Sequence, residues 1–147
     1  MRQIVVDGAH AYIASREDGL FIVDVSDAEK PSLISRHDTI EFATGICKSG
    51  DVLFVACRSF GVELIDVSDP SHPKHLSIVR TGEAQSVVEQ NGFLYAGVWA
   101  TSEVVAVDVQ NPWQPQIVSR TPLDGFGDGV DVDGTWLYAA TGHHSRK

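Results

Sequence analysis

The densest cluster of carboxylates lies near the end of the sequence, in a glycine-rich segment that contains Asp124, Asp128, Asp131 and Asp133. Carboxylate oxygens are the ligands that calcium prefers, and an EF-hand loop needs oxygen ligands at its first, third and fifth positions and glutamate at its twelfth. With Gly134 as the sixth residue, Gly129 and Ala140 would occupy positions one and twelve. The segment is therefore not an EF-hand loop, and a looser contact through Asp128 and Asp131 is the remaining calcium alternative.

Histidine pairs are the next candidates for metal chemistry. His143 and His144 are neighbours at an expected strand end, and neighbouring side chains on a strand point to opposite faces. His72 and His75 flank Pro73 in an expected outer turn. We therefore predict no metal site and no cofactor.

The two cysteines are not expected to form a disulfide. If the chain turns at Ser49-Gly50, Cys47 pairs near Val52 or Leu53, which leaves Cys57 about 13–17 Å away at strand rise. A disulfide needs Cα atoms within about 7 Å. Both thiols are therefore predicted to be small buried side chains.

Charge and hydropathy exclude several function classes. Eleven Lys and Arg against twenty Asp and Glu give a formal charge of −9, which repels phosphate backbones and argues against nucleic acid as a partner. Apolar runs are far shorter than the roughly 20 residues that cross a membrane, so no membrane insertion is expected. The N-terminal residues become polar too early for a signal peptide. We find no phosphate-binding loop, dinucleotide fingerprint or nucleophile elbow.

The elements that would position these residues follow from an internal repeat. Several residue types recur every 42 positions. The recurring positions are Gly8, Gly50, Gly92 and Gly134; Asp24, Asp66 and Asp108; Val25, Val67 and Val109; and Pro31, Pro73 and Pro115. Each glycine lies between two apolar segments, as in a β-hairpin turn. A β-branched run ending in Asp-Val and a more polar segment after the proline supply two further strands, so each repeat predicts four short antiparallel strands.

A four-stranded unit of this length is a β-propeller blade. We therefore predict an all-β chain of about three and a half blades in one partial domain over residues 1–147. The expected blades cover about 2–38, 43–81, 84–122 and, with two strands only, 128–147.

The segments around the repeated aspartates also carry a family resemblance. Leu20-Phe21-Ile22-Val23-Asp24-Val25-Ser26-Asp27 and Val62-Glu63-Leu64-Ile65-Asp66-Val67-Ser68-Asp69-Pro70 resemble the LVIVD repeat, and the likeness extends over the whole chain. The third copy departs from it with Gln110-Asn111, and the first has Ala28 in place of proline. The resemblance implies a propeller in a bacterial or archaeal protein, outside the cytoplasm or at the cell surface, and implies no reaction.

Three and a half blades do not close a ring, and closure is what covers blade faces in a propeller. We therefore expect the chain to be part of a longer product, or two copies to complete one ring, and we expect exposed blade faces to self-associate.

Candidate ligand-binding residues are the loop positions that differ between repeats, because a site inside a ring needs different residues from different blades. They are Thr44, Gln85 and Asp128 between blades, and Arg16, Glu17, Arg58, Trp99, His143 and His144 in the loops within blades. Such a rim suits a protein, peptide or glycan, so the leading interpretation is a non-catalytic binding or scaffold module. The alternative is a propeller enzyme, a hydrolase or metal-dependent oxidoreductase, to which Asp128, His143 and His144 contribute. A third is a spacer between other domains.

The repeated aspartates are interpreted as structural. Asp24, Asp66 and Asp108 each precede a turn, and three equivalent copies favour carboxylates that accept hydrogen bonds from that turn. We expect these turn donors to be buried, so replacing Asp66 with alanine should leave them unsatisfied and cost roughly 1–3 kcal/mol.

Overall fold

Four antiparallel sheets make up residues 2–142, the part of the chain that the computed structural model describes. The first sheet consists of β1 (Gln3–Asp7), β2 (His10–Ala14), β3 (Leu20–Asp24) and β4 (Ser32–His37). The second consists of β5 (Gly45–Ser49), β6 (Val52–Ala56), β7 (Val62–Asp66) and β8 (Lys74–Val79). The third consists of β9 (Ala84–Gln90), β10 (Phe93–Val98), β11 (Glu103–Asp108) and β12 (Gln116–Pro122). The fourth has two strands, β13 (Phe126–Asp133) and β14 (Trp136–Gly142).

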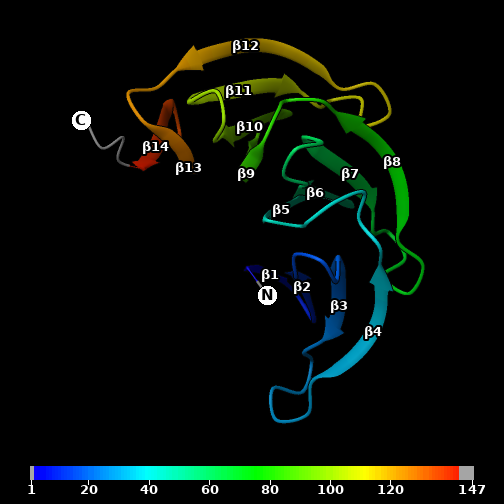
Figure 1. The fold of residues 1–147 in the computed structure, drawn as a ribbon. Coiled ribbons are helices and arrows are strands. Elements are labelled where there is room, and N and C mark those ends of the chain that lie inside the picture. The colour runs from blue at the N-terminus through cyan, green and yellow to red at the C-terminus, as the bar shows by residue number, and fades with distance from the viewer. Residues whose placement is uncertain (1, 143–147) are drawn as a thin grey trace.

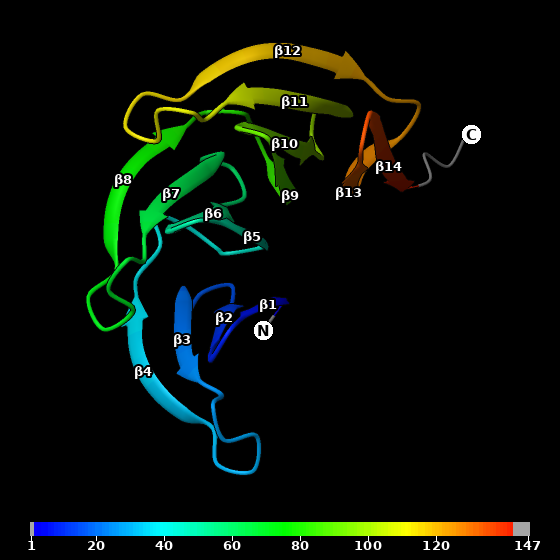
Figure 2. The same ribbon diagram turned by 180° about the vertical axis from the view of Figure 1, so that it is seen from behind.

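The sheets follow one another around an open arc, as Figures 1 and 2 show from opposite sides. The first strand of each sheet (β1, β5, β9 and β13) lies on the inside of the arc, and the fourth strand (β4, β8 and β12) lies on the outside. This is the blade arrangement of a β-propeller, as the 42-residue repeat predicts. The described part of the chain contains no helix that could span a membrane.

The hairpin turns lie one residue later than the glycine pattern suggests. Asp7 pairs with His10, Ser49 with Val52, and Asp133 with Trp136, so glycine is the first central residue of each turn. The φ angles of Gly8, Gly50 and Gly134 are 57°, 53° and 60°, as a type II′ turn requires at its first position. The expected pairing of Cys47 is therefore wrong by one or two residues, because its partner is Phe54.

The third blade turns differently. Gln90 pairs with Phe93, and both central residues, Asn91 and Gly92, have positive φ, at 54° and 82°. This is the type I′ pattern that Asn-Gly favours. Because the glycine comes second here, the strand that follows begins one residue earlier in its repeat than in the other blades.

Two apolar layers hold neighbouring sheets together. Side chains alternate along a strand, so Leu53 and Val55 pack toward the first sheet while Phe54 and Ala56 pack toward the third. Burial on both faces explains why the inner strands are apolar runs rather than alternating patterns. Each fully buried leucine or isoleucine in these layers contributes about 1.5–3 kcal/mol.

Polar contacts join the blades at two radii. On the outside, the Ser35 hydroxyl donates to the Pro70 carbonyl and the Ser77 hydroxyl donates to the Pro112 carbonyl, both at 2.6 Å. On the inside, the Thr44 hydroxyl lies 3.0 Å from the carbonyl oxygens of Ala56, in its own blade, and Ala84, in the next. Equivalent serines 42 residues apart therefore make equivalent contacts between blades.

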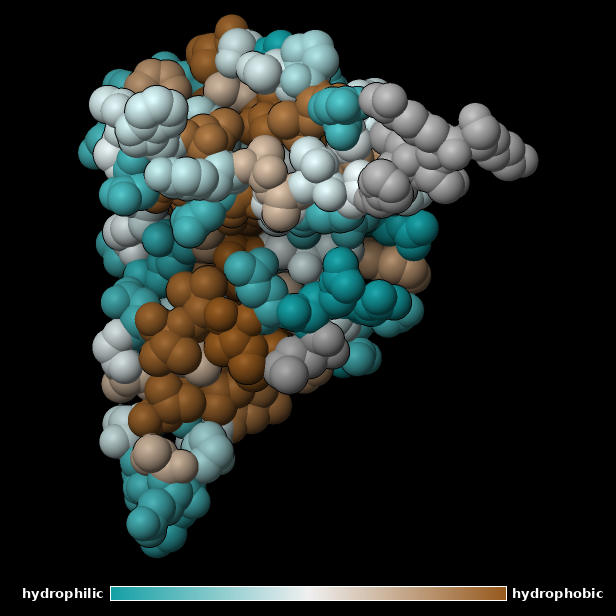
Figure 3. Space-filling model, turned by 90° about the vertical axis from the view of Figure 1, so that its left-hand side faces the viewer, coloured by the Kyte–Doolittle hydropathy of each residue, from teal (hydrophilic) through white to brown (hydrophobic). Residues whose placement is uncertain are grey.

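The first sheet leaves one apolar face uncovered. Ile4, Val6 and Leu33 are 45%, 61% and 63% exposed, respectively. A hydrophobic patch lies low on the molecule in Figure 3, at the height of the first sheet in Figure 1. At the other end of the arc, Trp136 and Tyr138 of β14 are exposed as well.

Candidate functional site

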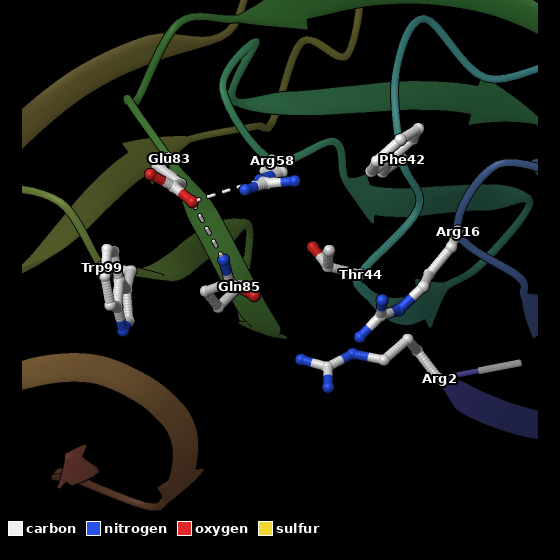
Figure 4. A pocket seen from close by; sticks show the side chains of 8 residues that line it. All are labelled: Arg2, Arg16, Phe42, Thr44, Arg58, Glu83, Gln85 and Trp99. Atoms are coloured by element: carbon white, nitrogen blue, oxygen red, sulfur yellow. Dashed lines mark hydrogen bonds and ion pairs between the residues drawn. The ribbon is translucent and has the colours of Figure 1, made fainter.

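A pocket of about 270 Å³ lies on the inner side of the arc, where loops of the first three blades meet (Figure 4). Its wall consists of Arg2, Arg16, Phe42, Thr44, Arg58, Glu83, Gln85 and Trp99. These residues come from the loops between the second and third strands of a blade, from the connections between blades, from the start of β9, and from the N-terminal residues before β1. The pocket therefore combines residues of three blades, among them the equivalent pair Arg16 and Arg58.

Five of the residues that the sequence singled out line this pocket: Arg16, Thr44, Arg58, Gln85 and Trp99. Asp128 is exposed and Glu17 is exposed, and neither belongs to the wall of the pocket. His143 and His144 lie outside the described residues. The geometry thus brings together the rim positions of the first three blades.

Sequence reasoning missed Arg2, Phe42 and Glu83. The repeat contains a signal for Arg2, because it lies 42 residues before Thr44. Phe42 and Glu83 each lie two residues before a predicted rim residue, and in an extended connection residues two apart share a face. The same period and alternation could have found all three.

Two of the arginines have an uncommon backbone conformation. The φ angles of Arg16 and Arg58 are 46° and 40°, in the left-handed region that residues other than glycine rarely adopt. Arg16 pairs by its backbone with Ala43, just before β5, and Arg58 pairs with Ala84, the first residue of β9, so each residue links its blade to the entry of the next. Equivalent positions in two blades therefore hold the same strained geometry.

One carboxylate lies among the pocket residues, and it is already engaged. The Arg58 Nε donates to Glu83 Oε1 at 3.3 Å, and the Gln85 side-chain nitrogen lies 3.5 Å from the same oxygen (Figure 4). The Arg58 guanidinium also lies 5.8 Å from the centre of the Phe42 ring. Within residues 2–142, the guanidinium groups of Arg2 and Arg16 have no carboxylate partner.

Trp99 forms one side of the pocket. Its ring stacks on Phe126 of the fourth sheet, with centroids 4.3 Å apart and an interplanar angle of 16°. Its backbone N–H donates to the Glu83 carbonyl at 2.9 Å. Trp99 remains 39% exposed, so a fixed aromatic surface faces the open side of the site.

A β-bulge explains the position of Gln85. The register between β9 and β10 shifts so that Gly97 pairs with Ser86 and Val98 with Ala84, which leaves Gln85 unpaired. A similar shift leaves Asp128 unpaired between β13 and β14. Bulges re-aim a side chain at a sheet edge, and here one directs Gln85 toward the pocket.

A second polar centre lies between the first and second blades, on the buried carboxylate of Glu63. Glu63 Oε1 is 3.1 Å from His37 Nε2 and 2.9 Å from His75 Nδ1, and the Ile40 N–H donates to Oε2 at 2.9 Å. Burial raises the pKa of Glu63, but the hydrogen bonds from the two histidines and Ile40 lower it more, so that the carboxyl has a pKa below its ordinary value. The cluster lies apart from the pocket and ties β7 to β4, β8 and the connection before β5.

The repeated aspartates all accept a hydrogen bond from the turn that follows. Asp24 Oδ1 accepts from the Ser26 N–H at 2.8 Å, Asp66 from Ser68 at 2.8 Å, and Asp108 from Gln110 at 3.0 Å. The hydroxyl and backbone N–H of Ser26 lower the pKa of Asp24. These hydrogen bonds are exposed, so the expectation that the turn donors are buried is wrong.

The cysteines carry free thiols. Burial raises the pKa of Cys57 to about 12 and also raises the pKa of Cys47. The thiolate is the reactive form of cysteine, so both are protonated packing residues at neutral pH. Within residues 2–142, no group of three or more histidine, cysteine, aspartate or glutamate side chains has an arrangement suited to a metal ion.

Radially ordered four-stranded sheets with a pocket at their inner edge define the class of a β-propeller. Within that class, the sequence model of the LVIVD repeat matches residues 1–39, 43–81 and 81–121. The chain belongs to the LVIVD repeat family.

Solved structures of low sequence identity share this fold. The crystal structure of Myxococcus xanthus glutaminyl cyclase is 19% identical, with a TM-score of 0.51 over 72% of this chain and 47% of that one. The computationally designed Ika8 protein is 5% identical, with a TM-score of 0.57 over 92% and 54%. A chain in the S. cerevisiae complex of a Dbp5 variant with Nup159, a Gle1 variant, IP6 and ADP is 9% identical, with a TM-score of 0.57 over 99% and 40%.

This chain spans about half the length of the structures that it matches. The comparison with curated protein sequences found no match.

Proposed function

We propose that this chain is a non-catalytic binding module of an LVIVD β-propeller, and that its ligand, on a protein, peptide or glycan, occupies the pocket at the inner edge of the first three blades. The observation that carries the proposal is the convergence of rim residues from three blades on one pocket: the repeat-variant Thr44, Gln85 and Trp99, and the equivalent pair Arg16 and Arg58. Positions that vary between otherwise regular repeats are free of the packing role that fixes the others.

The composition of the pocket supports binding rather than catalysis. Among residues 2–142 its wall contains neither histidine nor cysteine, and Glu83 is held by Arg58 and Gln85 rather than left available as a base. Arginine and tryptophan are the residues most enriched where binding energy concentrates in protein interfaces. The cavity is slightly smaller than the roughly 300–1,000 Å³ of typical ligand pockets, which favours one residue-sized group as the occupant.

The proposal is tested by capture on arrays of peptides and glycans with matched tryptophan variants. Trp99→Ala removes an exposed surface of the pocket, whereas Trp113→Ala removes a tryptophan that is 63% exposed in the turn between β11 and β12. We expect the first variant to lose the captured ligands and the second to retain them, with circular dichroism showing that both remain folded. Equal capture by folded forms of both variants would contradict the pocket as the binding site.

A further inference from the structure

We propose that the pocket recognises the carboxylate of an acidic peptide, an aspartate or glutamate side chain that enters between Arg2, Arg16 and Arg58. This inference rests on the proposed binding function and names its ligand class. Figure 4 shows the side chains of Arg2 and Arg16 extending from the first blade toward the open centre of the pocket, opposite Trp99.

The first support is that the charge of the pocket is opposite in sign to that of the whole chain. The whole chain has a formal charge of −9, yet the pocket wall carries three arginines and one glutamate. Glu83 offsets Arg58, which leaves the charges of Arg2 and Arg16 uncompensated by carboxylates of the described residues. A site of opposite sign to the rest of the protein steers and selects a ligand of complementary charge, here an anion.

The second support is the balance of donors and acceptors. Arg2 and Arg16 offer guanidinium N–H donors, and a guanidinium is a rigid donor fork that matches a carboxylate. Three wall side chains carry acceptor oxygens: Glu83 Oε1 accepts from Arg58, the Thr44 hydroxyl donates to carbonyl oxygens at the base of the site, and Gln85 has an amide oxygen. Guanidinium donors dominate this wall, so a group that only accepts hydrogen bonds matches it better than sugar hydroxyls, which also need acceptors for their own protons.

The third support is the backbone strain at Arg16 and Arg58. Holding a residue other than glycine in the left-handed region costs roughly 1–2 kcal/mol, and such strain in a fold marks functional positions. Both arginines hold this conformation at equivalent places, with φ of 46° and 40°. Arg16 extends into the pocket from the first blade and Arg58 lines it from the second, and backbone pairs with Ala43 and Ala84 hold both residues in place.

The test measures the fluorescence of Trp99 in a Trp113→Phe, Trp136→Phe background as peptide is added. The probes are a short capped oligoglutamate, a capped oligoglutamine of the same length and an oligogalacturonate. We expect oligoglutamate to change the Trp99 signal, oligoglutamine to leave it unchanged, and added salt to weaken the response because it screens the charges.

Arginine variants locate the response. Arg16→Asn keeps a residue that tolerates the left-handed conformation, and Arg36→Asn removes an arginine of β4 that lies over Phe21 and pairs with Asp38. Both variants change the net charge equally. We expect the first to weaken oligoglutamate binding about tenfold or more, as the loss of one charged hydrogen bond predicts, and the second to leave it unchanged.

Each contrary outcome has its own meaning. Equal effects of Arg16→Asn and Arg36→Asn, or equal binding of oligoglutamine, would overturn recognition of a carboxylate by the arginines. Binding of oligogalacturonate alone would overturn the peptide as the carrier. If Trp99→Ala abolishes capture of neutral ligands while oligoglutamate has no effect, the carboxylate inference fails and the binding function stands; if neither experiment detects binding at the pocket, both fail.

Discussion

Arg16 and Arg58 both have a strained backbone conformation, at equivalent positions of two repeats. In a scaffold whose turns place glycine at most positions of positive φ, these two arginines adopt it with a side chain attached. Both make backbone pairs at the entry of the next blade, so neither could change conformation without disturbing that contact. The strained conformation persists because the strands on either side fix each loop at both ends.

The repeated aspartate leads to a test at the same scale. Asp66→Ala removes the acceptor for the Ser68 N–H, and we expect the free energy of unfolding to fall by about 0.5–1 kcal/mol, the lower part of the range for a net hydrogen bond. The value is below the 1–3 kcal/mol expected for a buried donor because water can replace this exposed contact. Urea denaturation measures it. Asp66→Asn retains an acceptor oxygen and should recover most of the loss; if it destabilises as much as alanine, the hydrogen bond is not the cause.

At the scale of elements, the contacts between neighbouring sheets matter more than the strands themselves. The strands of each sheet can be predicted from a single repeat, but the polar contacts between sheets join residues far apart in sequence. Glu63 illustrates this, because its partners His37 and His75 come from the outer strands of two different blades. An apolar layer supplies adhesion between blades, and these polar contacts set the angle and register at which the blades meet.

Acid should weaken the contact that Glu63 makes between the first and second blades. The pKa of this carboxyl is lower in the folded chain than its ordinary value of 4.5, so its contribution is fully present above that value and is lost as pH falls through the lower folded pKa. We therefore expect wild-type stability to fall below about pH 4.5. Glu63→Gln should be destabilised by about 1–3 kcal/mol at neutral pH, through the loss of a charged acceptor.

Chemical denaturation at neutral and acidic pH measures both effects. The difference in stability between wild type and Glu63→Gln should shrink as the pH falls, because protonation removes from the wild type what the substitution has already removed. Glu17→Gln is the matched control, since Glu17 is exposed in a loop of the first blade. A difference that grows on acidification would contradict the assignment.

Gly45 tests how closely two blades approach. A Cβ at this position would lie 2.7 Å from the Gln85 carbonyl oxygen and 2.9 Å from the Ser86 Cα, both of them backbone atoms of the third blade. Gly45→Ala should therefore lower stability by about 1–3 kcal/mol through overpacking. In Gly129→Ala the added Cβ would make only an ordinary contact, 3.4 Å from the Ala140 Cβ. Thermal unfolding of the two variants should differ accordingly, and equal melting temperatures would rule out this close approach.

At the scale of the whole molecule, the period of 42 residues predicted the sheets, their order and most of the pocket. It predicted less well wherever one repeat departs from the others: the Asn91-Gly92 turn shifts a strand by one residue, and the glycine-first turns move the register of Cys47. The Glu63 cluster was not predictable, because Phe21 occupies the equivalent position one repeat earlier and because His37, one of the partners of the carboxylate, belongs to the neighbouring blade. Strands, turns and rim residues could be predicted from the sequence of each repeat, whereas side-chain contacts between blades could not.

The uncovered face of the first sheet leads to a prediction about assembly. Ile4 is 45% exposed, whereas Ile46, its equivalent 42 residues later, is fully buried against the first blade. We propose that this chain self-associates through the face that carries Ile4 and Val6. Light scattering over a concentration series should show a mass that rises with concentration, and Val6→Glu should shift it toward the monomer.

The control for this prediction is Val118→Glu, which places the same charge at a valine that is 54% exposed on the outer strand β12. It should leave the association unchanged. A constant monomer mass for the wild-type chain at every concentration would contradict the prediction.

The serine contacts on the outside of the arc have a consequence for how such a protein can change in length. Ser35 and Ser77 each donate a hydrogen bond to a proline carbonyl of the next blade, so the same contact between blades recurs from one repeat to the next. A gene duplication that inserts residues 43–84 once more would supply the new blade with both junctions already matched. A propeller of this kind can therefore gain whole blades without a new type of contact between blades, and the pocket loops of the added blade can then diverge in sequence.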